Sequence, residues 1–269
     1  MLKNDILGNA VLIAAGGRSI LLQLADPAIG HGVADHSDFA RRPQDRLNNT
    51  LGFVYATVFG TADEAAAAAR RVNHAHVPVR SEGSAGAPAY SAFTPALQLW
   101  VAATLYDSAV SMHELVYGPL DDPLATELYT EYRRLGTALQ VPVELWPPDR
   151  AAFRVYWDQR LTELKTDAAT RAVAHDVLYS RTGPLWIRAG LPLGRLMTTG
   201  LLPPTVREMF GLEWSAPRQR RFDRMLGVIR MVYPPLPLFI RHWPKNHYLR
   251  VLRGSLRAAS PPTPAGPAR

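Results

Sequence analysis

The stretch TADEAAAAARRVNHAHV, residues 61–77, predicts the best-defined element of this chain. Thr61 and Glu64 have the spacing of a capping box, in which each side chain accepts a hydrogen bond from the backbone N–H of the other residue. Five alanines follow, and alanine has the highest helix propensity of all residues. Because Pro78 cannot continue a helix, we predict a helix over residues 61–77.

Helical patterns of apolar residues also lie on both sides of this stretch, separated by Pro and Gly. Alternating strand patterns are scarce, and no internal repeat is present. We predict helices at 7–26, 28–39, 46–59, 94–116, 124–139, 148–164, 168–179 and 218–231, with loops at 81–90 and 200–204. The sequence therefore predicts an all-α fold in a single compact domain of residues 1–256, followed by a Pro-rich disordered tail at 257–269.

Single residues in the predicted helix at 94–116 indicate how the core is built. Leu99, Trp100 and Leu105 have helical spacing, which is more typical of core residues than of a ligand pocket. Asp107 lies in an otherwise apolar run, so it needs a partner if it is buried. We expect an arginine there, and Arg18 is a candidate for Asp107 or for an acidic group of a cofactor.

The composition is that of a globular protein and excludes several kinds of site. Of 269 residues, 47% are hydrophobic and 20% are charged. The absence of cysteine excludes disulfides, zinc–thiolate sites, cysteine-ligated iron–sulfur clusters, thiolate-ligated haem and a cysteine nucleophile. The sequence also lacks the phosphate-binding loops, the H-E-x-x-H metal motif and the G-x-S-x-G nucleophile motif, which disfavours nucleotide enzymes and hydrolases.

Basic residues are concentrated near the C-terminus. The net charge is +7, and residues 207–257 hold eleven Lys or Arg and three acidic residues. Such a segment suits nucleic acid, an anionic membrane surface or acidic groups of a cofactor, and a solvated face is the more common case. No basic motif interleaved with aromatic residues is present, so we expect no nucleic-acid partner. With no long apolar run and a poor signal peptide, we expect a cytoplasmic protein, with peripheral membrane contact as an alternative.

Histidine is the remaining versatile metal ligand. None of the eight histidines forms an i, i+4 pair, so the sequence does not indicate a non-haem site with two ligands on one helix. A haem iron needs only one rigidly held imidazole. His74 suits this role, because it lies in the last turn of the alanine-rich helix and Arg71 shares its face. On this pattern alone, a structural or surface histidine is the more common case.

Several motifs, in the same order, resemble the MpaB-type oxygenase family, which shares its catalytic domain with rubber oxygenase, the latex-clearing protein. The similarity covers about residues 8–255. The motifs are GGR (16–18), LQLADP (22–27), GVADHS (32–37), RLNNT (46–50), VFGT (58–61), RVNHAHV (71–77), YSA (90–92), LWVAATL (99–105), DS (107–108), GLLPP (200–204), RE (207–208) and GL (211–212).

The resemblance implies an all-α protein with a haem b pocket in the helical core. The proximal histidine of the family lies in an Arg-x-x-His context, which matches Arg71 and His74. The distal side of the rubber enzymes carries Arg-x-x-Lys-Thr, which matches Arg46, Asn49 and Thr50. Their lysine can occupy the sixth position of the iron, whereas asparagine is a poor ligand. This position is therefore expected to be open or water-filled here, and rubber is a doubtful substrate.

The implied activity is a haem-dependent reaction of dioxygen with a hydrophobic, isoprenoid-like alkene, by oxidative cleavage or oxygenation. Arg46 and Thr50 would stabilise developing negative charge, and Asp35 and His36 are the nearest candidates for a base. Buried polar residues bonded to helix ends are the alternative for this pair. Asp26 stands where family members often carry histidine. A non-catalytic protein that binds haem or a hydrophobic ligand, and a nucleic-acid or membrane-surface module, are the alternative functions.

Overall fold

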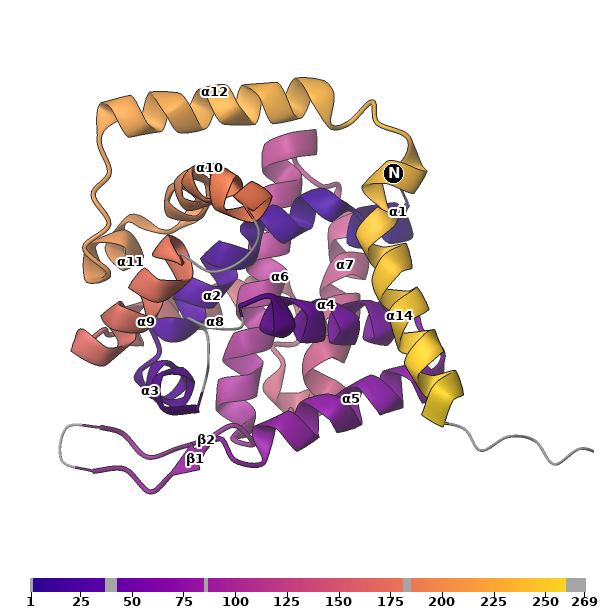
Figure 1. Cartoon of the computed structure of the whole chain (residues 1–269), viewed down its shortest axis with the longest axis vertical. Coiled ribbons are helices and arrows are strands. Elements are labelled where there is room, and N and C mark those ends of the chain that lie inside the picture. Colours follow the sequence, from indigo (N-terminus) through magenta and orange to yellow (C-terminus); the bar gives the residue numbers. More distant parts are fainter. Residues whose placement is uncertain (1, 37–42, 85–86, 181–184, 260–269) are drawn as a thin grey trace, which may run out of the picture.

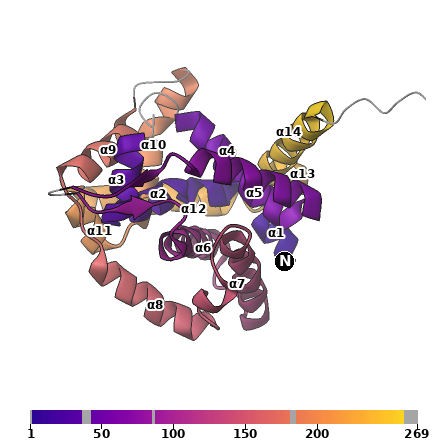
Figure 2. The ribbon, with the colours of Figure 1, turned by 90° about the horizontal axis from the view of Figure 1, so that it is seen from below.

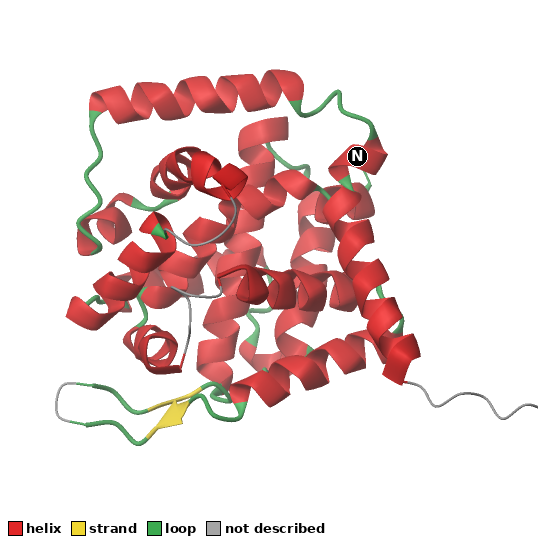
Figure 3. Ribbon diagram, viewed as in Figure 1, coloured by secondary structure: helices red, strands yellow, loops and turns green. Residues whose placement is uncertain are grey.

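The computed structural model describes residues 2–36, 43–84, 87–180 and 185–259, and nearly all elements in these residues are helical (Figures 1 and 3). The all-α prediction is confirmed. The elements are α1 (Lys3–Leu7), the 3-10 helix η1 (Ala10–Ala15), α2 (Gly16–Leu24), α3 (Pro27–His36), α4 (Pro43–Phe59), α5 (Ala62–His76), β1 (Arg80–Ser81), β2 (Tyr90–Ser91), α6 (Pro95–Tyr117), α7 (Asp122–Thr137), η2 (Val143–Leu145), α8 (Arg150–Glu163), α9 (Ala168–Tyr179), α10 (Leu185–Leu201), α11 (Pro204–Met209), α12 (Ala216–Val232), α13 (Leu238–Arg241) and α14 (Trp243–Ala259).

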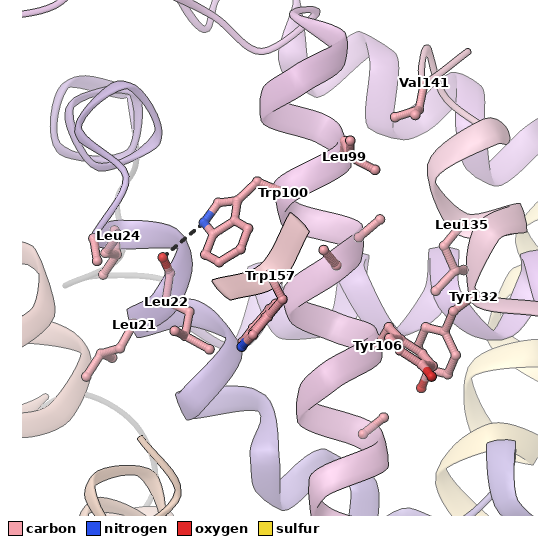
Figure 4. Close-up of a cluster of buried hydrophobic side chains, with 14 of the residues drawn as sticks. Leu21, Leu22, Leu24, Leu99, Trp100, Tyr106, Tyr132, Leu135, Val141 and Trp157 are labelled. Atoms are coloured by element: carbon pink, nitrogen blue, oxygen red, sulfur yellow. Dashed lines mark hydrogen bonds between the residues drawn. The ribbon is translucent and has the colours of Figure 1, made fainter. Parts of the chain in front are cut away.

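Helix α6 is the central element, and α2, α7, η1 and α12 pack against it. Trp100 on α6 is fully buried, and its indole N–H donates to the carbonyl of Leu22 at 3.1 Å (Figure 4). The ring of Trp157, from α8, lies 5.1 Å away between centroids. Leu99 is also buried, and Leu105 packs against the same core. The prediction that these three α6 residues belong to the core is confirmed.

A buried arginine connects three helices to α2. Arg18 donates to Asp107 at 2.5 Å and to Ser108 at 2.8 Å on α6, and to the carbonyl of Leu201 at the end of α10 at 2.8 Å. Its guanidinium also lies over the ring of Trp157, 5.6 Å from the centroid. The predicted pairing of Arg18 with Asp107 is confirmed. Arg18 therefore has a structural role, in which it stabilises the packing of the helices. Removing one partner of such a pair leaves an uncompensated charge.

The capping box predicted for α5 is present. The hydroxyl of Thr61 accepts from the Glu64 amide at 3.2 Å, and the Glu64 carboxylate accepts from the Thr61 amide at 3.0 Å. The same carboxylate also accepts from Arg253 of α14 at 2.7 Å. The hydrogen bond from Arg253, together with that from Thr61, lowers the pKa of Glu64. One residue therefore starts α5 and attaches α14 to it.

The structure differs from the sequence prediction in several elements. No helix was predicted at α10, which contains Pro192 and three glycines, or at α14. The predicted loop at 81–90 starts and ends in the paired strands β1 and β2, and the loop at 200–204 is helical up to Leu201 and again from Pro204. Helix α14 ends at Ala259, two residues after the predicted start of the tail, and residues 260–269 lie outside the described part. No helix of the described residues is long and apolar enough to cross a membrane.

Two neighbouring glycines at the start of α2 have different surroundings. A Cβ on Gly17 would lie 2.1 Å from the hydroxyl oxygen of Thr198 on α10 and 3.1 Å from the Cβ and Cγ2 of that residue. Rotation of the threonine therefore does not relieve the clash. A Cβ on Gly16 would meet nothing within 4 Å. Gly17 is thus needed for the close approach of α2 and α10.

We expect Gly17→Ala to lower the free energy of unfolding by about 1–3 kcal/mol, because one helix must shift. Gly16→Ala is the matched control, since Gly16 has helical backbone angles and open space. It should leave stability unchanged or raise it by up to about 1 kcal/mol. Urea unfolding followed by circular dichroism measures both values, and equal effects of the two variants would contradict the packing argument.

An ion pair holds α3 against α9. The buried His31 of α3 lies 2.6 Å from the carboxylate of Asp167, which also accepts from the Thr170 amide at the start of α9 at 2.9 Å. The Thr170 amide, together with His31, lowers the pKa of Asp167 to about 2. Asp167 therefore stabilises the folded chain in its ionised form.

We expect Asp167→Asn to lower the free energy of unfolding at pH 7 by about 1 kcal/mol or less, because this carboxylate is partly exposed. Asparagine keeps the N-cap acceptor and removes only the charge. The folded pKa is below the ordinary value, so the contribution is complete above about pH 4 and is lost as the pH falls toward 2. Urea unfolding of both proteins between pH 7 and pH 3 tests this, and a difference that grows on acidification would contradict it.

Candidate functional site

Helices α4 and α5 pack together over only part of their lengths. The two are joined by a short connection and spread apart from it in the view of Figure 1. Phe53, Tyr55 and Ala56 of α4 are buried, as are Ala67 and Ala68 of α5. By contrast, all four side chains of residues 47–50 in α4 are exposed, and so are most side chains in the last turns of α5. The start of α4 and the end of α5 therefore form an uncovered region.

His74 and Arg71 both lie in this region, on α5. Both side chains are exposed, and the imidazole of His74 makes no hydrogen bond within the described part of the chain. The structure therefore does not place His74 in the helical core, where the sequence predicted a haem pocket. The reason is that side chains such as Trp100 and Trp157 already fill the core. A ligand of His74 would have to lie against the uncovered region.

The residues predicted on the opposite side of the site come from α4. Asn49 and Thr50 are exposed and close in sequence to Leu47, which is 41% exposed. Arg46 lies within α4, but its side chain is outside the described part of the structure. Asn49 and Thr50 are thus exposed at the start of α4, and His74 is exposed at the end of α5, the helix that follows and packs against α4.

Asp35 and His36 lie at the end of α3, and both are exposed. The predicted alternative of buried polar residues is therefore wrong for this pair. The hydroxyl of Tyr90, on β2, donates to Asp35 at 2.7 Å, and the ring of His36 meets the ring of Tyr90 edge-on at 5.9 Å. Burial, followed by the bond to Asp35, raises the pKa of Tyr90 to about 12. Tyr90 is a polar neighbour of this pair that the sequence analysis did not single out.

Two further side chains near the site also escaped the sequence analysis. Tyr248 of α14 donates to Asn48 of α4 at 2.7 Å, and its ring stacks on Tyr55. His76, two residues after His74, is half-buried, and its ring meets Phe93 edge-on at 6.4 Å. Neither pairing could be predicted from local spacing, because each joins residues that are distant in the sequence. His76 is a second imidazole near the end of α5.

Asp26, which replaces the histidine common in the resembling family, has a structural environment here. It is buried, and its carboxylate pairs with Arg160 of α8 at 2.5 Å. It also accepts from the amides of Ala28 and Ile29 at 3.0 and 3.1 Å, which caps the start of α3. Asp26 therefore orients α3, which carries Asp35 and His36 at its other end.

The side chains available as ligands in the uncovered region limit which metal or cofactor it can bind. Within the described residues, no three His, Asp or Glu side chains are grouped so as to hold a metal ion. A single imidazole with exposed apolar and cationic neighbours suits the axial position of a haem, which needs one protein nitrogen and contacts for a flat ring. Exposed Val77, next to the last turn of α5, adds apolar surface. The exposed imidazole of His74 therefore offers an accessible nitrogen of the kind that ligates haem iron, on a surface rather than in an enclosed pocket.

Comparisons with known proteins identify the family of the chain. Residues 5–231 match the family model described as ER-bound oxygenase mpaB/B'/Rubber oxygenase, catalytic domain. The uncharacterized proteins Mb2261 of Mycobacterium bovis and Rv2237 of Mycobacterium tuberculosis are each 40% identical to the chain over 224 residues, which is 81% of this chain and 88% of theirs. No solved structure matches the chain.

The resemblance inferred from the ordered motifs is thereby confirmed, since the matched residues include α2 to α6 and therefore every predicted site residue. The all-α architecture, the uncovered ends of α4 and α5 and the family match together lead to one conclusion. This chain belongs to the family of the mpaB and rubber oxygenase catalytic domain.

Proposed function

We propose that this chain is a haem b-dependent oxygenase that acts with dioxygen on a hydrophobic, isoprenoid-like alkene. The family is an oxygenase catalytic domain, which supports the reaction class. The observation that carries the haem proposal is the exposed imidazole of His74 in the last turns of α5. Cleavage and oxygenation of the alkene are both compatible with these residues.

His74 and Arg71 are the residues that would hold the haem. The imidazole of His74 would bind the haem iron, and its exposure makes a ring nitrogen available without breaking a hydrogen bond within the described residues. Arg71 lies three residues earlier on the same face, where its guanidinium would pair with a propionate carboxylate. The haem iron would supply the redox chemistry that activates dioxygen.

The start of α4 would line the reaction side. Thr50 would donate a hydrogen bond to developing negative charge, and Arg46 would add a positive charge there. Asn49 has an amide in place of a strong iron ligand, so it would leave room for small molecules. Leu47 and Val77, which are 41% and 57% exposed, would provide apolar contacts and exclude water when the cofactor covers them.

The end of α3 would supply the base for an allylic proton. The carboxylate of Asp35 already accepts a hydrogen bond from Tyr90, which fixes its orientation. His36 packs against the same tyrosine ring. Asp26 and His31 attach α3 at two points nearer its start, so these residues would position the base without touching the substrate.

The ligand assignment predicts a spectroscopic change. Purified protein reconstituted with hemin should show a Soret band, and His74→Ala should weaken hemin binding by roughly tenfold or more, because the axial bond is lost. His76→Ala is the matched control, since His76 lies two residues away and packs on Phe93. Helical content by circular dichroism should be equal in all three proteins.

Two results would contradict this assignment. A protein that ignores hemin at normal helical content would exclude the cofactor. A Soret band that survives in His74→Ala but not in His76→Ala would transfer the axial role to His76.

The distal assignment predicts the effect of Asn49→Lys. The exposed position accepts a longer side chain, and an amine can occupy the sixth position of the iron, as in the resembling rubber enzymes. We expect the ferric spectrum to change from high-spin to low-spin and carbon monoxide binding to slow. Asn48→Lys is the neighbouring control, because Asn48 is bonded to Tyr248 of α14. An identical spectrum for Asn49→Lys and the wild type would contradict the placement of Asn49.

The reaction class is tested by dioxygen consumption. Haem-loaded protein should consume dioxygen with one or more unsaturated isoprenoids or lipids, and His74→Ala should lower the rate at least tenfold. A haem-loaded protein that consumes no dioxygen with any of them would instead be a sensor or carrier of haem or of a hydrophobic ligand.

A further inference from the structure

An exposed apolar corner lies where α12, α13 and the start of α14 meet (Figure 1). Large apolar side chains on a soluble face usually mark an interaction site when they are clustered. Met231, Phe239 and Trp243 are 71%, 72% and 61% exposed. The apolar corner consists of Val228, Met231, Val232, Leu238, Phe239, Ile240 and Trp243, all of them exposed.

The corner is held firmly by residues that point inward from the same segment. The hydroxyl of Tyr233 donates to Asn9 at 2.9 Å and accepts from the amide of Val11 at 3.0 Å. Arg241 donates to the carbonyl of Leu236 and to the hydroxyl of Tyr117. These bonds join the segment to the start of the chain and to the end of α6. The outward side chains are therefore displayed on a packed support.

Basic side chains adjoin the apolar corner along α14. Trp243, Arg250 and Arg257 are spaced seven residues apart, so they share one face of the helix. Arg253 lies beside them and is also exposed. The basic face, defined here as Arg250, Arg253 and Arg257, lines an open groove of about 400 Å³ along α14, and Arg253 also pairs with Glu64 of α5. Residues 216–258 contain ten Lys or Arg and one acidic residue, Asp223.

We propose that the apolar corner and the basic face together bind the surface of an anionic phospholipid bilayer. Aromatic side chains such as Phe239 and Trp243 enter the interfacial region of a bilayer, where their rings leave water. Arg250 and Arg257, which are exposed beside them on α14, attract anionic headgroups. The contact is peripheral, because the apolar corner is too small to cross the bilayer.

The charge distribution favours a bilayer over the other occupants. A second copy of the chain would bring the same basic residues together, and like charges repel. Nucleic acid would satisfy the arginines but would leave Phe239, Ile240 and Met231 without an apolar partner. An anionic bilayer provides both negative charge for the arginines and an apolar environment for the exposed apolar side chains. This inference does not depend on haem or on the oxygenase reaction.

The test measures binding of the full chain to sedimented vesicles. We expect binding to vesicles of phosphatidylcholine with 30% phosphatidylglycerol, a composition chosen to give roughly the negative surface potential on which polybasic segments act. Vesicles of phosphatidylcholine alone should bind about tenfold more weakly, and high salt should weaken binding to the anionic vesicles. Phe239→Ser/Trp243→Ser and Arg250→Gln/Arg257→Gln should each lower the affinity by about tenfold or more.

Val143→Ser/Val155→Ser is the matched control, because these valines are 51% and 68% exposed in η2 and α8. Helix α8 lies far from α14 (Figure 2), so this variant should bind anionic vesicles as the wild type does. All changed positions are exposed, and circular dichroism confirms that each variant is folded.

Four results would overturn the proposal. They are no binding to anionic vesicles at low salt, unchanged binding by Phe239→Ser/Trp243→Ser, salt-sensitive binding to duplex DNA or RNA without vesicle binding, and a dimer in sedimentation velocity that Phe239→Ser/Trp243→Ser dissociates.

Discussion

The arrangement of the helices depends on the buried guanidinium of Arg18. It joins α2 to the Asp107 carboxylate and the Ser108 hydroxyl of α6, and to the last turn of α10 through the carbonyl of Leu201. The ring of Trp157 from α8 lies beneath it. An arginine that is buried among helices fixes their positions, because any displacement would leave a charge without its partners. The close approach of Gly17 to Thr198 is a consequence of the same packing.

The sequence predicts the elements whose signals are local. The capping box of α5, the core position of Trp100 and the need of Asp107 for a cationic partner all follow from short-range spacing or from the cost of burial. Helix α10 was not predicted because Pro192 and three glycines are typical helix breakers, although packing keeps the helix intact. Helix α14 was not predicted because basic residues interrupt its pattern of apolar residues. Its apolar side is recognisable only from its packing against α4 and α5.

For the candidate site too, the sequence predicts what depends on local motifs but not what depends on contacts between distant residues. The family motifs identify His74, Arg71, Asn49 and Thr50, and the structure brings them to the uncovered ends of two consecutive helices. The sequence cannot predict which turns of α4 and α5 remain exposed, because this depends on the packing of α14 and α7 against them. It also cannot reveal the bond between Tyr90 and Asp35, which joins residues 55 positions apart.

Helix α3 is attached at three points along its length. Asp26, paired with Arg160, fixes its start, and His31 joins its middle to Asp167. Its last turn is held by Tyr90 of β2, which bonds to Asp35 and packs on the ring of His36. Because the third attachment comes from the short strand pair rather than from the helical bundle, the position of Asp35 depends on how β1 and β2 pair.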